Sequence, residues 1–96
     1  INIKLSGTMR TFSGLQIQIR VINISEGGIE FSATQSLPFD ILVSVQILKI
    51  QMVMKIVRCK VRKKKFVYGS SLVDIDVNSR VRLLETIKKI YNPRAK

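Results

Sequence analysis

The residues best suited to chemistry are two short polar side chains that lie just before a pair of glycines. Asn23 and Ser25 are two positions apart, so in a strand their side chains share one face. Gly27 and Gly28 follow, and they predict a turn where a ligand can approach the backbone closely. An amide, a hydroxyl and backbone N–H groups on one edge suit a purine edge and a nearby phosphate. One hypothesis for this segment is therefore a nucleotide-binding edge.

The same segment has a purely structural interpretation. Asn23 and Ser25 would hydrogen-bond the local backbone, and Gly27 and Gly28 would supply the positive φ of a hairpin turn. Local geometry by itself favours this second interpretation over the first.

A second candidate binding feature is a run of positively charged side chains. Its members are Lys55, Arg58, Lys60, Arg62, Lys63, Lys64 and Lys65. Lys60 and Arg62 alternate with apolar residues, as on the exposed face of a strand. Such a run either protects a sheet edge from aggregation or attracts an anionic ligand, an acidic partner or a nucleic acid. Within it, Arg58 is the residue that we expect to make a secondary ligand contact.

Composition narrows the possible functions. The chain has 96 residues, which predicts a single domain over 1–96, and 46% of them are hydrophobic, enough for a modest core. The formal charge is +11, from 17 Lys and Arg against 6 Asp and Glu, and it favours an anionic partner. The chain has no histidine, which excludes His-based triads and His-ligated metals. No nucleophile–base pair or metal-ligand spacing appears, so we expect neither an enzyme nor a bound cofactor.

Cysteine usage and hydropathy bear on the compartment. Cys59 is the single cysteine, and one unpaired thiol fits a reducing compartment, so we expect a cytoplasmic protein. Polar residues interrupt the most apolar stretch, residues 41–57, and we therefore expect no transmembrane segment.

Period-two alternation predicts antiparallel strands over the first three quarters of the chain. Apolar residues are odd-numbered from 41 to 47 and even-numbered from 50 to 56, so a turn or bulge is expected near 48–51. The basic residues 62–65 predict another turn, with a further strand from Phe66 to about Val73.

The end of the chain has a helical pattern. The residues that recur at helical spacing are Val81, Leu84, Ile87 and Tyr91. They predict an amphipathic helix over about 77–91 that packs this apolar stripe on the sheet. Asp76 or Asn78 would cap its start, and Asn92-Pro93 would end it. Several strands followed by one helix predict a small barrel or curled sheet with a terminal helix.

The motif Asn23-x-Ser25-x-x-Gly28 resembles the (D/N)xSxxG motif of PilZ domains, which are bacterial receptors for cyclic di-GMP. Other segments similar to the family pattern are Ile56-Val57-Arg58, Tyr68-Gly69, Leu72-Val73-Asp74 and the closing helix. The resemblance covers nearly the whole chain. It implies a mainly β fold, a six-stranded antiparallel split barrel with a C-terminal amphipathic α-helix packed on it.

The resemblance also implies a ligand and roles for the site residues. Asn23 would contact a guanine edge, Ser25 a phosphate or guanine, and Gly28 the closely approaching cyclic di-GMP. Gly27 and Arg58 complete the expected site. An amide offers one acceptor oxygen where a carboxylate offers two, so Asn23 should recognise guanine more weakly than Asp would.

The N-terminus departs from the family pattern. In PilZ domains an RxxxR pair precedes the first strand, whereas this chain opens at Ile1 within the expected strand. Because Ile1 is not methionine, we expect the chain to continue a longer gene product. Either the arm lies upstream, or the domain lacks it and loses charge-assisted contacts worth about 1.5–3 kcal/mol each. The literal match from Arg58 to Arg62 lies inside a later strand and is not that arm.

Three functions remain open. The first is a cyclic di-GMP receptor that signals to a partner protein of flagellar, pilus, secretion or polysaccharide machinery. The second is a divergent PilZ domain that binds no nucleotide and serves as a protein-docking module. The third, a basic barrel that binds RNA, is disfavoured because few aromatic residues are left to stack bases. The aromatic residues expected in the core are Phe12, Phe31, Phe66 and Tyr91.

Overall fold

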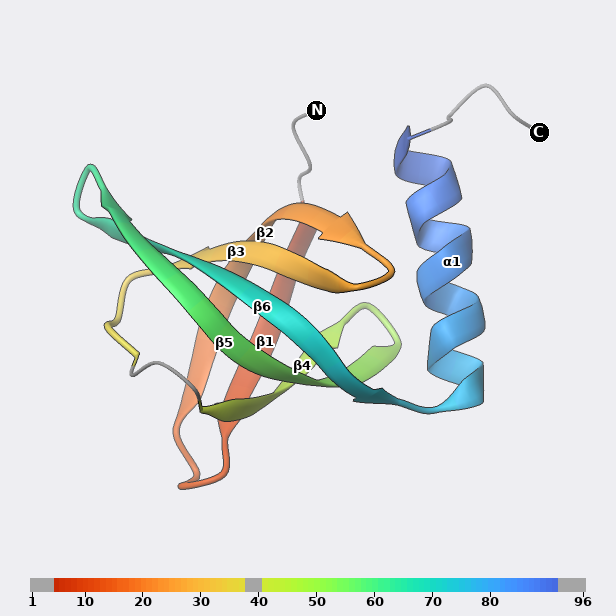
Figure 1. Ribbon diagram of the computed structural model, residues 1–96, viewed down its shortest axis with the longest axis horizontal. Coiled ribbons are helices and arrows are strands. Elements are labelled where there is room, and N and C mark those ends of the chain that lie inside the picture. The colour runs from red at the N-terminus through yellow and green to blue at the C-terminus, as the bar shows by residue number, and fades with distance from the viewer. Residues whose placement is uncertain (1–4, 38–40, 92–96) are drawn as a thin grey trace.

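The computed structural model describes residues 5–37 and 41–91. Within them the elements are β1 (Leu5–Thr11), β2 (Gln16–Ser25), β3 (Gly28–Ala33), β4 (Leu42–Ile47), β5 (Ile50–Arg62), β6 (Lys65–Ile75) and α1 (Val77–Tyr91). The strands are antiparallel and close into a barrel in the order β1-β2-β3-β6-β5-β4 (Figure 1). The predicted six-stranded barrel with a C-terminal helix is confirmed.

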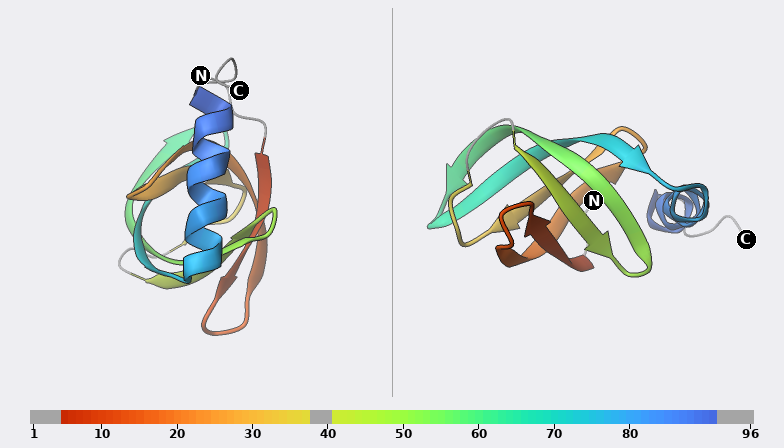
Figure 2. Two further views of the ribbon diagram at one scale, coloured as in Figure 1. Left: turned by 90° about the vertical axis from the view of Figure 1, so that its right-hand side faces the viewer. Right: turned by 90° about the horizontal axis from the view of Figure 1, so that it is seen from below.

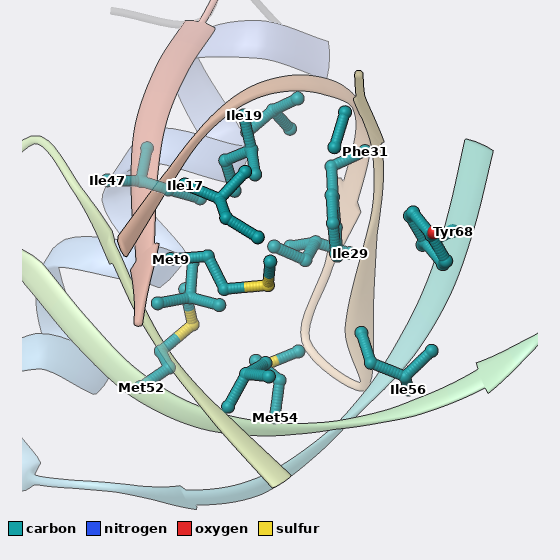
Figure 3. Close-up of a cluster of buried hydrophobic side chains, with 14 of the residues drawn as sticks. Met9, Ile17, Ile19, Ile29, Phe31, Ile47, Met52, Met54, Ile56 and Tyr68 are labelled. Atoms are coloured by element: carbon teal, nitrogen blue, oxygen red, sulfur yellow. The ribbon is translucent and has the colours of Figure 1, made fainter. Parts of the chain in front are cut away.

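Alternate residues of the strands fill the barrel interior (Figure 3). The largest fully buried side chains are Tyr68, Phe31, Met9, Ile24, Ile47, Ile50, Met54 and Ile56. Side chains occupy the inside of a barrel of this size. The groups that a ligand can reach therefore lie on the outer surface and in the turns.

Two predicted turns are confirmed. Leu48 and Lys49 join β4 to β5, and Lys63 and Lys64 join β5 to β6. Both lysines of the second turn have left-handed φ, 45° and 68°, as a tight hairpin turn of the primed type requires. The long β5–β6 hairpin extends beyond the neighbouring strands (Figure 1).

Asp76 caps α1, as one of the two expected capping residues. The Ser79 backbone N–H donates to Asp76 Oδ1 at 2.8 Å, and Ser79 Oγ donates to Asp76 Oδ2 at 3.1 Å. Ser79 Oγ also accepts from the backbone N–H of Gln51 at 3.2 Å, which fastens the helix start to β5. The helix lies beside the barrel (Figure 2). The helix of the described residues, α1, is not long and apolar enough to span a membrane.

The rotation of α1 differs from the prediction. Leu83 is buried and Ile87 packs against the core, but Val81 of the predicted stripe is 50% exposed. The cap explains the difference, because its hydrogen bonds turn Ser79 toward the barrel. Leu83 lies four residues later on the same face of the helix and therefore also points inward. The Tyr91 side chain and the predicted stop at Asn92-Pro93 lie outside the described residues.

The cap predicts a pH-dependent contribution to stability. The hydrogen bond from Ser79 N–H holds the pKa of Asp76 below its ordinary value. The pKa of Asp76 is lower in the folded than in the unfolded protein, so the ionised carboxylate stabilises the fold above about pH 4. This stabilisation is lost as the pH falls through the pKa of the folded protein. We expect Asp76→Asn to lower the free energy of unfolding at about pH 6 and to have a smaller effect at about pH 3.

Urea unfolding of the wild type and of Asp76→Asn at the two pH values measures the change in the free energy of unfolding. Asp74→Asn, at an exposed carboxylate two residues earlier, is the matched control. An effect of Asp76→Asn that is equally large at both pH values would contradict the assignment.

Candidate ligand-binding groove

An open groove of about 250 Å³ lies on the outer surface where the β2–β3 hairpin meets β6 and β5. The five residues predicted from the sequence to bind a ligand all line it: Asn23, Ser25, Gly27, Gly28 and Arg58. The fold therefore brings Arg58 to the hairpin from a distant part of the chain. That these residues bind a ligand stays a prediction.

A β-bulge in β2 turns the polar pair outward. Ile19 and Val21 are buried, so unbroken alternation would bury Asn23 next. The register shifts between Val21 and Asn23, which leaves Ile22 as an extra residue. Asn23 and Ser25 are exposed as a result, and Ile24 enters the core between them.

A second bulge, in β5, does the same for Arg58. Met54 and Ile56 are buried, so Arg58 would otherwise point inward. The register shifts between Ile56 and Arg58, with Val57 as the extra residue. The Arg58 side chain is 62% exposed on the outer surface. Bulges commonly redirect a side chain in this way beside functional sites.

One row of residues crosses four strands of the sheet. Asn23 pairs with Glu30, Glu30 with Gly69, and Gly69 with Arg58. Neighbouring strands lie about 4.8 Å apart, so the row spans about 15 Å. Arg58 Nη2 lies 3.6 Å from Glu30 Oε2, so the guanidinium reaches across β6 to β3.

Gly69 makes room for the Arg58 side chain. A Cβ on Gly69 would lie 2.5 Å from Arg58 Nε and 2.9 Å from Cζ. The neighbours of Gly69 in β6 point inward: the Tyr68 hydroxyl donates to Gln35 O at 3.0 Å, and Ser70 Oγ donates to Ile29 O at 2.8 Å. These two hydrogen bonds fix the orientation of β6, so that Gly69, which has no side chain, faces the groove. Burial raises the pKa of Tyr68.

Sequence reasoning did not identify Glu30 or Gly69 as site residues. Glu30 alternates with buried Ile29 and Phe31, which places it on the outer face but does not connect it to Arg58. Gly69 belongs to a segment that resembles the family pattern, but the resemblance assigns it no role in the site. A glycine inside a strand signals the close approach of another group, and that signal could have identified it.

The turn glycines do not have the backbone conformation expected of them. Gly14, with φ 101°, is the described glycine in the left-handed region, so the expectation of positive φ at Gly27 and Gly28 is wrong. A Cβ on Gly28 would collide with the backbone carbonyl oxygen of Ser70. A Cβ on Gly27 would meet no described atom within 4 Å. The packing of β6 therefore requires Gly28, and Gly27 is the glycine that is open to a ligand.

Ser25 takes part in the hairpin itself. Its hydroxyl donates to Gly28 O at 3.2 Å, which is the local hydrogen bond of the structural interpretation. The carbonyl of Gly27 accepts from Leu72 N–H at 2.8 Å. Since Ser25 is exposed, its hydroxyl oxygen can also accept a hydrogen bond from a ligand.

Cations continue outward from the groove along β5. Arg58, Lys60 and Arg62 pair with Gly69, Val67 and Lys65 of β6, respectively. Lys60 and Arg62 are exposed, which confirms the exposed strand face expected for them. The stripe of positive charge thus runs from the groove to the tip of the β5–β6 hairpin.

The aromatic residues differ in part from expectation. Phe31 is buried and Phe66 packs against the core, but Phe12 is 71% exposed, so its expected core position is wrong. Phe12 lies in the β1–β2 turn, closed by a hydrogen bond from Gly14 N–H to Thr11 O at 3.0 Å. A turn at a barrel end offers no interior for its side chain. Phe12 lines a different surface from the groove, whose described lining contains no aromatic residue.

Comparison with protein families matches residues 1–89 to the family described as the PilZ domain. The match includes all the described strands and most of α1. No curated protein matches the sequence.

The two turn glycines yield a test of their separate roles. We expect Gly28→Ala to lower the free energy of unfolding by about 1–3 kcal/mol, because the new methyl group displaces the β6 backbone. Gly27→Ala should change it by less than about 0.5 kcal/mol. Urea unfolding measures both. Equal effects at the two positions would show that β6 does not impose the requirement for Gly28.

Proposed function

The chain belongs to the PilZ domain family, and on that premise we propose that it is a receptor domain that binds cyclic di-GMP in this groove. PilZ domains are a family of cyclic di-GMP receptor domains. The observation that supports the proposal most strongly is the gathering of the five predicted residues around one outward-facing groove.

Each residue would have a distinct part in binding. The Asn23 amide would contact the edge of a guanine, and the Ser25 hydroxyl would contact a phosphate or the base. Gly27, with open space above it, would let the ligand lie against the turn. Arg58 would supply a charge-assisted hydrogen bond to a phosphate.

The groove suits part of the ligand. Its volume of about 250 Å³ is below the roughly 300–1,000 Å³ of typical small-molecule sites. One guanine with its phosphate would occupy the groove, and the other half of the dinucleotide would need further donors. The RxxxR arginines of the family would have that role in an arm before the first strand.

The start of β1 is well placed for such an arm. Leu5 pairs with Val21, so the chain enters the barrel at the end of β2 that carries Asn23 and Ser25. An arm ordered by the ligand would change the surface that the domain offers to a partner protein. This is how we propose that the second-messenger level is relayed.

One observation favours the alternative of a docking module without nucleotide. Glu30 neutralises Arg58 within the groove, and its negative charge opposes a phosphate. The two alternatives therefore differ in whether the domain binds cyclic di-GMP at all.

Calorimetric titration of the full-length protein with cyclic di-GMP separates them. We expect a micromolar dissociation constant, and about a tenfold weaker one for Ser25→Ala, equivalent to about 1.4 kcal/mol. Ser13→Ala is the matched control, because Ser13 also makes a local hydrogen bond at a hairpin turn but lies outside the groove.

No heat from the wild-type protein at micromolar concentrations would end the receptor hypothesis. Salt-dependent binding to random RNA, unchanged by Ser25→Ala, would support the nucleic-acid alternative instead.

A further inference from the structure

Glu30 is the acidic residue in the described lining of the groove. A carboxylate is unfavourable in a site for an anionic ligand unless it contacts a part of the ligand that donates hydrogen bonds. Neither the family motif nor the function proposed above assigns it a role.

The position of Glu30 is defined by its neighbours in the row. Asn23 is its register partner on β2, and Gly69 is its partner on β6. Side chains of directly paired residues lie about 4.5–5.5 Å apart at Cβ, so Asn23 and Glu30 can contact one planar group together. The Glu30 side chain is 32% exposed, which leaves its carboxylate accessible from the groove.

The chemistry of a guanine edge fits this pair. Guanine presents two adjacent donors, N1–H and the exocyclic amine, next to the acceptor O6. A carboxylate can accept a hydrogen bond from each of these donors, one at each oxygen, and an amide N–H can donate a hydrogen bond to O6. Asn23 alone has one acceptor oxygen, so it cannot accept the two hydrogen bonds in the parallel geometry that two carboxylate oxygens allow. Adenine presents an acceptor at N1, which a carboxylate would repel.

Arg58 holds the carboxylate in the free protein. Its guanidinium lies across Gly69 and 3.6 Å from Glu30 Oε2. Arg58 is exposed and Glu30 is half-buried at the surface, and ion pairs at the protein surface contribute little to stability. Arg58 can therefore exchange Glu30 for a phosphate without loss of the fold.

We propose that Glu30 is the guanine-reading carboxylate of this domain, and that Arg58 passes from Glu30 to a ligand phosphate on binding. This inference rests on the proposed function, because it names the group that selects the base in the same groove. The opposite possibility is that Glu30 is merely the counterion of Arg58. The two differ in sign: loss of a base-reading carboxylate weakens binding, whereas loss of a counterion strengthens it.

The experiment is calorimetric titration of the full-length protein and its variants with cyclic di-GMP and with its inosine analogue, which lacks the exocyclic amine. Glu30→Gln keeps the size of the side chain but replaces one acceptor oxygen with an amide NH2 group, which cannot accept a hydrogen bond from a guanine donor. We expect it to weaken cyclic di-GMP binding at least tenfold and to reduce the preference for guanine over inosine. Glu26→Gln, on the same hairpin but outside the described groove lining, should change neither.

Arg58→Ala provides the complementary comparison. It should weaken binding of both ligands alike and reduce the salt dependence, while the preference for guanine over inosine remains. Arg62→Ala is its control, because Arg62 lies on the same face of β5 away from the groove. Circular dichroism of each variant establishes that it is folded.

Two results would overturn the inference. If Glu30→Gln binds cyclic di-GMP as tightly as the wild type or more tightly, Glu30 is a counterion and does not read the base. If the wild type binds both ligands equally, the exocyclic amine is not recognised, whatever the variants do. A wild-type protein that binds neither ligand rejects the proposed function itself, and the inference with it.

Discussion

Period-two alternation in a closed barrel determines which side chains face the core, and the groove exists because this alternation is broken at the two bulges beside it. The bulges at Ile22 and Val57 each insert one residue, on opposite flanks of the groove. Without them Asn23 and Arg58 would follow their buried predecessors into the interior. The polar site and the apolar core thus depend on the same change of register.

The groove also depends on two glycines, whose lack of a side chain leaves room for neighbouring groups. Gly28 lets β6 pack against the hairpin, and Gly69 lets Arg58 lie across β6 toward Glu30. A side chain at either position would separate groups that the sheet brings together. The result is a groove in which an amide, a carboxylate and a guanidinium lie in one row across four strands.

The strands, the turns and the family could be predicted from the sequence, because each depends on a local pattern. Alternation predicts the strands, the change of phase after Ile47 predicts the β4–β5 turn, and the order of the short motifs indicates the family. What could not be predicted depends on contacts between distant segments. The link from Arg58 to Glu30, the collision that requires Gly28, and the rotation of α1 all follow from the pairing of separate elements. Phe12 is exposed and not in the core, and alternation could not predict this because it does not show where a barrel ends.

We propose that the outward-facing row on β2, β3, β6 and β5 binds the ligand. Backbone amide chemical shifts of the ¹⁵N-labelled full-length protein, followed during titration with cyclic di-GMP, test it most directly. The account predicts that the largest changes fall on the row itself and on the adjoining hairpin turn, at Asn23, Ser25, Gly27, Glu30, Arg58 and Gly69. A second polar groove, of about 530 Å³, includes Arg10 of β1 and Gln46 of β4. Changes concentrated in that groove, with the row unaffected, would contradict the account.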